Sequence, residues 1–150
     1  MTSIIAYKMD GLGNDFIIID RRKNSINLTR EKIIELGSRS NIGFDQIIFI
    51  EKEKEKFFPI TIFNSDGGEI SACGNGSRCV AYLLGKNLNT KDIKLKTKNR
   101  LLNAKIVGNL QVELEMGKPL FSYEDIPLSK TINPADVTLE INNKKFTSGF

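Results

Sequence analysis

The sequence contains no histidine, and this absence excludes several classes of site. A Ser-His-Asp triad and a Cys-His pair both need an imidazole, so neither can be built within these 150 residues. A zinc site with a histidine ligand is excluded in the same way, and two cysteines are too few for a four-cysteine site. Proton transfer must therefore use cysteine, aspartate, glutamate, lysine or tyrosine side chains, and we expect neither a metal nor a cofactor.

Tryptophan is also absent, and no apolar run approaches the roughly 20 residues of a membrane span. The net charge of +4 comes from lysine and arginine residues that are dispersed along the chain rather than gathered in a basic stripe. We therefore expect neither a nucleic acid nor a membrane as a partner. The amino terminus lacks the pattern of a signal peptide, and so few cysteines indicate reduced thiols, so the expected location is cytoplasmic.

Proline is scarce in the first part of the chain and more frequent near its end. Three of the four prolines follow Gly117 and interrupt the pattern of strands and helices. We place a domain boundary there, with one domain over residues 1–117 and the start of an incomplete second domain over residues 118–150. A chain of 150 residues is long enough for one domain with a substantial core and part of another.

Short apolar runs separated by polar turns predict a chain rich in strands. The expected strands are Ser3–Lys8, Phe16–Asp20, Gln46–Lys52, Phe57–Asn64, Ile93–Thr97, Leu101–Val107, Leu110–Met116, Val137–Ile141 and Lys145–Thr147. Met9–Asp15 is rich in glycine and polar residues, and we expect it to be a tight loop outside both neighbouring strands. Glu51–Lys56 is expected to be a solvated hairpin tip, Asp66–Gly68 a turn, and Asn142-Asn143 the turn of a last hairpin.

Two segments predict helices. Thr29 is an N-cap candidate for a helix through Leu36, and Gly37 is expected to end that helix in the left-handed conformation. A second helix is expected to begin just after Cys73 and to continue to Leu88, with apolar positions that cover more than a narrow stripe. Many strands with two helices, one of them central and buried, predict a mixed α+β domain.

Two glycine-rich segments resemble nucleotide-binding loops only superficially. Gly11–Phe16 has phenylalanine at the third glycine position and precedes a strand, whereas the dinucleotide fingerprint follows a strand. Gly74–Cys79 has cysteine at that position and lacks the lysine of a P-loop. Asn64–Glu69 is too short for a calcium loop. Nucleotide and calcium binding are therefore weak interpretations of this sequence.

Cys73 is well placed for chemistry because it directly precedes the second expected helix. A thiol there lies near unpaired backbone N–H groups and the positive end of the helix dipole, a position that lowers cysteine pKa values from about 8.5 to roughly 3.5–7.5. Such a thiolate is a nucleophile or a general base. An inert buried cysteine is the alternative, and the residues alone support the two interpretations about equally. Cys79 lies inside the helix among apolar residues and is expected to pack in the core.

Amide side chains recur beside the glycine-rich segments. Asn14, Asn64 and Asn75 each lie next to a glycine or at the end of a strand, and Gln46 opens a strand. An amide offers both a donor and an acceptor without charge, which suits a zwitterionic ligand. Each is also an ordinary turn or strand-end residue, and for Asn64 that interpretation is the better one. Only the convergence of several amides would define a site.

Four motifs occur in a fixed order along the chain. They are Lys8–Phe16, Ile42–Gln46, Phe63–Glu69 and Ala72–Cys79. Together they resemble the diaminopimelate epimerase family, closely up to about Gly117 and less closely beyond it. That family interconverts LL- and meso-diaminopimelate without pyridoxal, on the route to lysine and peptidoglycan. Its members contain two similar domains with the substrate in the cleft between them.

The resemblance implies an α+β fold with a mixed, mostly antiparallel sheet curled around a central helix. It also implies that Cys73 is one catalytic thiol. The substrate contacts that it implies are Asn14, Gln46, Asn64, Gly74 and Asn75. Asp10 stands where relatives often carry histidine, but the motif around it is intact.

Members of this family are nearly twice as long as this chain, and their second catalytic cysteine lies in the other half. The resemblance therefore implies an amino-terminal portion that has little activity alone and needs the carboxy-terminal half as its partner; a homodimer stays open. Two alternatives remain. One is another cofactor-independent racemase or isomerase of the same fold, and the other is a non-catalytic remnant that acts as a binding or assembly module.

Overall fold

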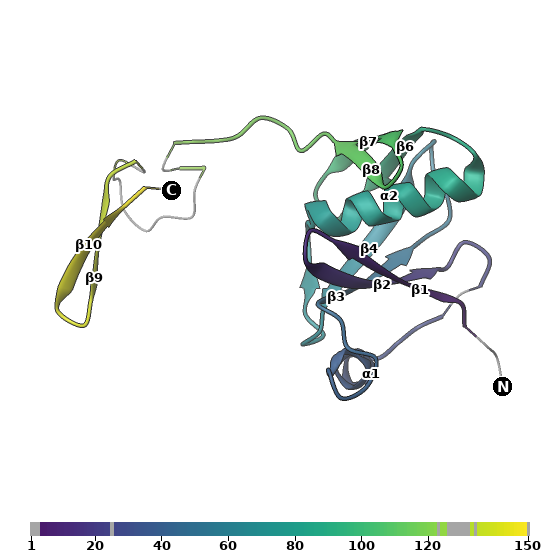
Figure 1. Ribbon diagram of the computed structural model, residues 1–150, viewed down its shortest axis with the longest axis horizontal. Coiled ribbons are helices and arrows are strands. Elements are labelled where there is room, and N and C mark those ends of the chain that lie inside the picture. The colour runs from purple at the N-terminus through teal and green to yellow at the C-terminus, as the bar shows by residue number, and fades with distance from the viewer. Residues whose placement is uncertain (1–3, 25, 123, 126–132, 134, 150) are drawn as a thin grey trace. The chain divides into compact units, whose positions relative to one another are not determined.

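The computed structural model describes residues 4–24, 26–122, 124–125, 133 and 135–149 (Figure 1). They divide into two compact units, Met1–Met116 and Gly117–Phe150. Within the described part of the chain, no helix is long and apolar enough to cross a membrane. The start of the first expected strand, Ser3, lies outside the described residues.

The first unit is built on an eight-stranded mixed sheet with the order β1-β2-β3-β4-β6-β7-β8, and β5 pairs with β4 beside this path. The strands are β1 (Ala6–Gly11), β2 (Asn14–Asp20), β3 (Gln46–Ile50), β4 (Phe58–Asn64), β5 (Glu69–Ile70), β6 (Asp92–Lys96), β7 (Leu101–Gly108) and β8 (Gln111–Leu114). The β2–β3 and β4–β6 pairs are parallel, and the other pairs are antiparallel.

The sheet curls around helix α2 (Gly74–Leu88), which touches strands near both ends of the sheet, β1 and β8 included (Figure 1). Val80, Ala81 and Leu84 on this helix are fully buried. The expected fold class, an α+β fold with a mostly antiparallel sheet around a central helix, is confirmed. The helix also begins directly after Cys73, as the sequence predicts.

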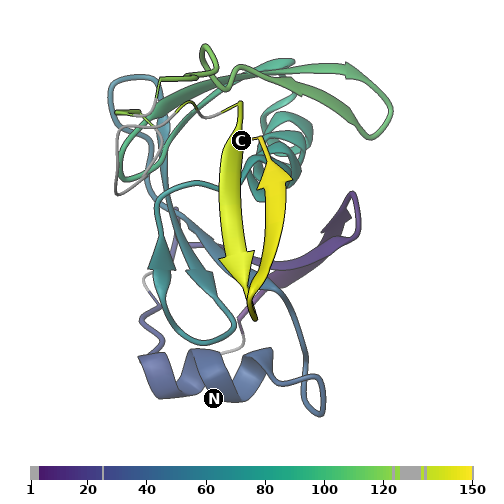
Figure 2. The same ribbon diagram turned by 90° about the vertical axis from the view of Figure 1, so that its left-hand side faces the viewer.

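Strands β2 and β3 are buried on both faces, which explains their continuous apolar sequences. Phe16 and Ile18 of β2 belong to the core cluster shared with α2, whereas Ile17 and Ile19 belong to a second cluster that contains Ile33 of helix α1 (Arg30–Gly37). The two helices therefore lie on opposite faces of these strands (Figures 1 and 2). Alternate residues of β2 thus pack on opposite sides of the sheet, one set toward α2 and the other toward α1.

Helix α1 begins as expected but ends differently. Thr29 is its N-cap, and the Thr29 hydroxyl accepts a hydrogen bond from the backbone N–H of Lys32 at 3.3 Å. The expectation that Gly37 ends the helix in the left-handed conformation is wrong, because Gly37 is its last helical residue and Ser38 is the cap. A β-carbon at Gly37 would lie 2.9 Å from Cβ of Ser65, so glycine is needed there for close packing.

The expected loop Met9–Asp15 is another correction. The β1–β2 ladder continues through these residues to the pair Gly11↔Asn14, so the turn consists of only Leu12 and Gly13. Both turn residues have positive φ, 54° and 88°, as in the two-residue turns that match strand twist. The sequence pattern did not reveal these strand ends because the tip of this hairpin is exposed, Leu12 included, and does not alternate between core and solvent.

The remaining connections agree more closely with the expectations from the sequence. The segment Glu51–Lys56 lies between antiparallel strands β3 and β4, which confirms the expected hairpin tip. In the second unit, β9 (Val137–Ile141) and β10 (Lys144–Ser148) form an antiparallel hairpin. Its turn residues Asn142 and Asn143 have φ values of 52° and 61°, a conformation that asparagine tolerates well.

Candidate active site

Cys73 stands at the amino-terminal end of α2 as its N-cap. Its Sγ accepts a hydrogen bond from the backbone N–H of Gly76 at 3.3 Å, and its carbonyl oxygen accepts from Ser77 N–H at 2.9 Å. The residue is half-buried, so the thiol is neither sealed in the core nor fully in solvent. The sulfur therefore lies at the positive end of the helix dipole, in a residue that packs against the core but is partly exposed.

The amides form two hydrogen-bonded pairs. Asn75 Nδ2 donates to Asn14 Oδ1 at 2.8 Å, and Gln46 Nε2 donates to Asn64 Oδ1 at 3.2 Å. Gln46 and Asn64 face each other across the β3–β4 ladder. Gln46 Oε1 is buried and has no donor within the part of the chain that the structure describes. This oxygen is therefore an unsatisfied acceptor beside Asn64.

The first pair depends on close contact between the β1–β2 hairpin and the start of α2. A β-carbon at Gly11 would lie 3.3 Å from the backbone oxygen of Asn75 and 3.1 Å from Sγ of Cys79. A β-carbon at this position would crowd the start of the helix, so glycine favours the close approach of the hairpin. Asn14, the first residue of β2, thereby reaches the side chain of Asn75, which follows Cys73 and Gly74 directly.

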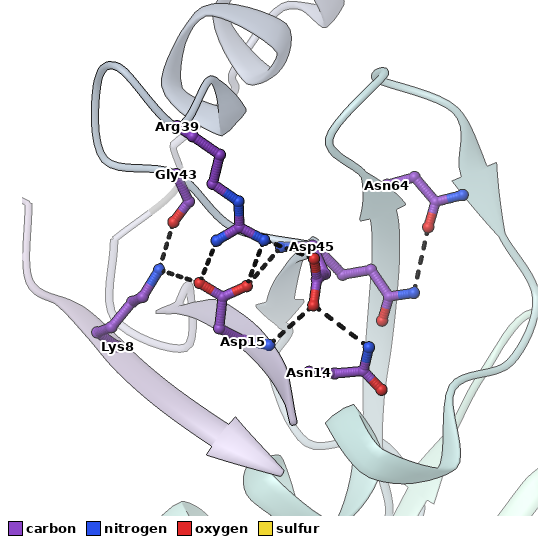
Figure 3. A network of polar contacts seen from close by, with 8 residues as sticks. Lys8, Asn14, Asp15, Arg39, Gly43, Asp45 and Asn64 are labelled. Carbon is purple, nitrogen blue, oxygen red and sulfur yellow. Dashed lines mark hydrogen bonds and ion pairs between the residues drawn. The ribbon is translucent and has the colours of Figure 1, made fainter. Parts of the chain in front are cut away.

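A cluster of charged residues adjoins these amides (Figure 3). Arg39 bridges two carboxylates, with distances of 2.6 Å from NH1 to Asp15 Oδ2 and 2.6 Å from NH2 to Asp45 Oδ1. Lys8 Nζ lies 2.6 Å from Asp15 Oδ2 and also donates to the carbonyl oxygen of Gly43. Two positive and two negative side chains thus hold the β1–β2 hairpin against the segment between α1 and β3.

No pattern in the sequence assigns a role to this cluster. Lys8, Asp15 and Asp45 lie within the motifs quoted above, which was the available signal, but Arg39 lies outside them. Nothing in the sequence pattern pairs residues as distant as Asp15 and Arg39, which are 24 positions apart. The amides expected to contact a ligand occur instead as two separate pairs, Asn14 with Asn75 and Gln46 with Asn64.

The pKa of Asp15 is lowered well below its usual value. The hydrogen bond from Arg39 is the largest cause, and Lys8 acts in the same direction, while burial opposes them. A carboxylate whose pKa is lower in the folded state stabilises the fold at pH values above its unfolded-state pKa. That contribution is lost as the pH falls through the lower, folded-state pKa.

We expect Asp15→Asn to reveal this dependence. At neutral pH the variant should have a smaller free energy of unfolding than the parent chain. Between about pH 4 and pH 2 the difference should shrink, because the unfolded Asp15 of the parent takes up a proton near its ordinary pKa of 3.8 while the folded one resists. Urea unfolding at several pH values measures this, with the exposed Asp92→Asn as control. A difference that stays constant with pH would contradict the assignment.

Cys79 lies in the core, as the sequence predicts. It is 6% exposed, and its Sγ donates to the backbone oxygen of Asp10 at 3.6 Å. Burial raises the pKa of the Cys79 thiol to about 11, and the Asp10 carboxylate adds to this effect. The two cysteines on and beside α2 therefore have different environments: Cys73 is partly exposed at the helix start, and Cys79 is buried.

We expect iodoacetamide at pH 7 to alkylate Cys73 at least 100-fold faster than Cys79. A rise of the Cys79 pKa from 9.0 to about 11 lowers its thiolate population by about 100-fold, and burial further limits access. Peptide mass spectrometry after timed quenching gives both rates, and alkylation in urea should make them similar. Equal, slow rates in the folded chain would favour the inert-cysteine interpretation of Cys73.

The fold is shared with phenazine biosynthesis proteins of the PhzF family. The solved structure from Bacillus anthracis has a TM-score of 0.55 and 22% identity, and the match covers 73% of this chain and 38% of that chain. The one from Enterococcus faecalis has a TM-score of 0.52 and 15% identity, covering 67% of this chain and 39% of that chain. At these identities the likeness concerns the fold alone.

Sequence comparison defines the family. The family model for diaminopimelate epimerase matches residues 6–122, so the chain belongs to the diaminopimelate epimerase family, and the resemblance noted above is confirmed. The diaminopimelate epimerase of Pelagibacter ubique (strain HTCC1062) is 49% identical over 149 residues, which cover 97% of this chain and 54% of that protein. That of Acidiphilium cryptum (strain JF-5) is 40% identical over 130 residues, covering 86% of this chain and 46% of that protein. The chain spans about half the length of these relatives.

No group of three or more histidine, cysteine, aspartate or glutamate side chains that could hold a metal ion occurs among the described residues. The site that the structure does present consists of one thiol, a helix start and paired amides.

Proposed function

We propose that this chain provides one half of a cofactor-independent epimerase that interconverts LL- and meso-diaminopimelate. The observation that carries the proposal is the position of Cys73: a partly exposed N-cap cysteine at the start of α2, two residues before Asn75 of the Asn14–Asn75 pair, in a chain of this family. The substrate is a zwitterionic amino acid, and amides together with helix-terminal N–H groups suit its carboxylate and ammonium groups.

In this proposal the thiolate of Cys73 removes the proton from Cα of the substrate on one face. The Cα–H bond breaks, an S–H bond forms, and the electron pair left on Cα spreads into the adjacent carboxylate. A thiol from the other half of the enzyme then donates a proton to the opposite face, which inverts the stereocentre. The acid and the base thus exchange roles in the reverse direction.

The start of α2 would stabilise the charge that develops on the carboxylate. Gly76 N–H already points to the Cys73 sulfur, whereas the N–H groups of Gly74 and Asn75 are the preceding ones in the first turn, which have no partner within a helix. Donors held in place before the reaction stabilise a developing oxyanion most effectively. Gln46 and Asn64, whose side chains already pair with each other, would bind the remainder of the substrate.

Deuterium incorporation at Cα of diaminopimelate in heavy water tests the proposal. The 150-residue chain alone should show little or no exchange, and a chimera that joins it to the remainder of the Pelagibacter ubique enzyme should show exchange and inversion. Exchange by the chain alone at ordinary enzyme rates would overturn the half-site proposal. A folded chimera that exchanges proline or hydroxyproline but not diaminopimelate would favour another racemase of the same fold, and a chimera that exchanges none of them would favour a binding module.

A further inference from the structure

Asp45 lies between α1 and β3 and is surrounded by hydrogen-bond donors (Figure 3). Its Oδ2 accepts from Asn14 Nδ2 at 3.2 Å and from the backbone N–H of Asp15 at 3.0 Å. Its Oδ1 accepts from Arg39 NH2 at 2.6 Å. Both oxygens therefore face donors, and only an acceptor-only group such as a carboxylate satisfies all three contacts.

The contact with Asn14 determines the orientation of the amides that follow. Because Asn14 directs its nitrogen to Asp45, its oxygen faces Asn75 and accepts from Asn75 Nδ2 at 2.8 Å. Asn75 in turn directs its oxygen to Arg78 of α2, whose NH2 group donates to it. The chain of contacts thus begins at a carboxylate, which only accepts, and ends at a guanidinium, which only donates. Reversing either amide would place like groups against each other.

The carboxylate of Asp45 is itself held firmly. The backbone N–H of Asp45 donates to the backbone oxygen of Asp15 at 2.9 Å and to Asp15 Oδ1 at 3.0 Å. The backbone N–H of Asp15 donates in return to Asp45 Oδ2. Arg39 contacts both carboxylates, and Lys8 contacts Asp15. The positive and negative charges of this cluster balance, so the carboxylate can remain in place without excess charge beside the site.

We propose that Asp45 is a positioning residue that, together with Arg78, sets the orientation of the Asn14 and Asn75 amides at the start of α2. Each amide keeps one N–H and one acceptor position for a ligand, and both then have a defined direction. The identity of that ligand rests on the function proposed above. Asp45 itself binds no substrate in this proposal and acts through Asn14.

Heteronuclear NMR of the isolated chain tests this series of contacts, from Asp45 through Asn14 and Asn75 to Arg78, without any ligand. Asp45→Asn is nearly isosteric, but its NH2 group must face a donor in either orientation. It should shift the side-chain amide signals of Asn14 and also those of Asn75, which Asp45 does not contact. Asp20→Asn is the matched control, because Asp20 pairs with Arg22 at the opposite end of β2 and should leave both signals unchanged.

Two further variants keep the NMR test decisive if Asp45→Asn does not fold. Asp45→Glu retains an acceptor-only group and should leave the signals of Asn75 closer to the parent than Asp45→Asn does. Arg78→Met perturbs the opposite end and should shift the amide signals of Asn14. The proposal is overturned if the Asn75 signals do not shift in the Asp45 variants and the Asn14 signals do not shift in Arg78→Met.

The chimera described above provides a kinetic measurement. Asp45→Asn should raise KM for diaminopimelate about tenfold while kcat changes less than threefold, because binding groups lose their orientation and Cys73 remains. If Asp45→Asn shifts the Asn75 signals but leaves KM unchanged, the amide contacts are supported and the positioning role for substrate binding is overturned. If the parent chimera shows no exchange at all, the proposed function fails, and the NMR result still decides whether Asp45 orients the amides.

Discussion

Replacing Cys73 with serine in the chimera should lower Cα–H exchange of diaminopimelate by about 10²–10⁴-fold, the usual contribution of a positioned acid or base. A serine hydroxyl is a much weaker acid than a thiol and cannot take and return a proton readily at neutral pH. Serine is nevertheless a favoured N-cap and can accept the Gly76 N–H that Cys73 now accepts. The free energy of unfolding should therefore stay the same or rise by up to about 1 kcal/mol.

Lost exchange with retained stability would show that Cys73→Ser affects proton transfer rather than folding. Cys79→Ala is the matched cysteine control, because Cys79 lies on the same helix and is buried in the core. It should lower stability modestly and leave exchange within a few-fold of the parent. Loss of exchange in both variants, or full exchange by Cys73→Ser, would contradict the assignment of Cys73 as the proton-transferring group.

Phe16→Ala should lower the free energy of unfolding by about 3–5 kcal/mol. Phe16 is fully buried in the core that β2 shares with α2. A β-carbon built at Gly11 would lie 3.4 Å from the Phe16 ring, and one built at Gly76 would lie 3.3 Å from it. Removing the ring therefore leaves a cavity directly beneath both segments that form the site, where the surrounding backbone cannot easily collapse.

Urea unfolding followed by far-ultraviolet circular dichroism measures this loss. Phe16→Leu fills part of the cavity and should cost less than Phe16→Ala. Phe121→Ala is the control, because Phe121 is 69% exposed and the same change there should stay within about 0.5 kcal/mol. A loss below about 1 kcal/mol for Phe16→Ala would mean that the core beneath the site is not packed as described.

Local sequence patterns were sufficient for the elements whose form depends on near neighbours. The N-cap at Thr29, the start of α2 after Cys73 and the turn at Asn142-Asn143 were all predicted from residues within a few positions. The ends of the β1–β2 hairpin were not, because polar residues there pair with each other across the ladder rather than with a core. Gly37 was misread for a similar reason: its role comes from Ser65, which is distant in the sequence.

The α+β class, the family resemblance, the buried strands and the helix that begins after Cys73 all follow from residue patterns along the chain. The pairing and orientation of the amide side chains depend on the folded arrangement of the strands. The parallel β2–β3 register aligns Phe16 with Gln46, and so brings Asn14 to Asp45, whose carboxylate also accepts from Arg39. Hydrogen bonds of this kind act over about 3 Å between groups far apart in the chain, so they exist only after the strands have paired.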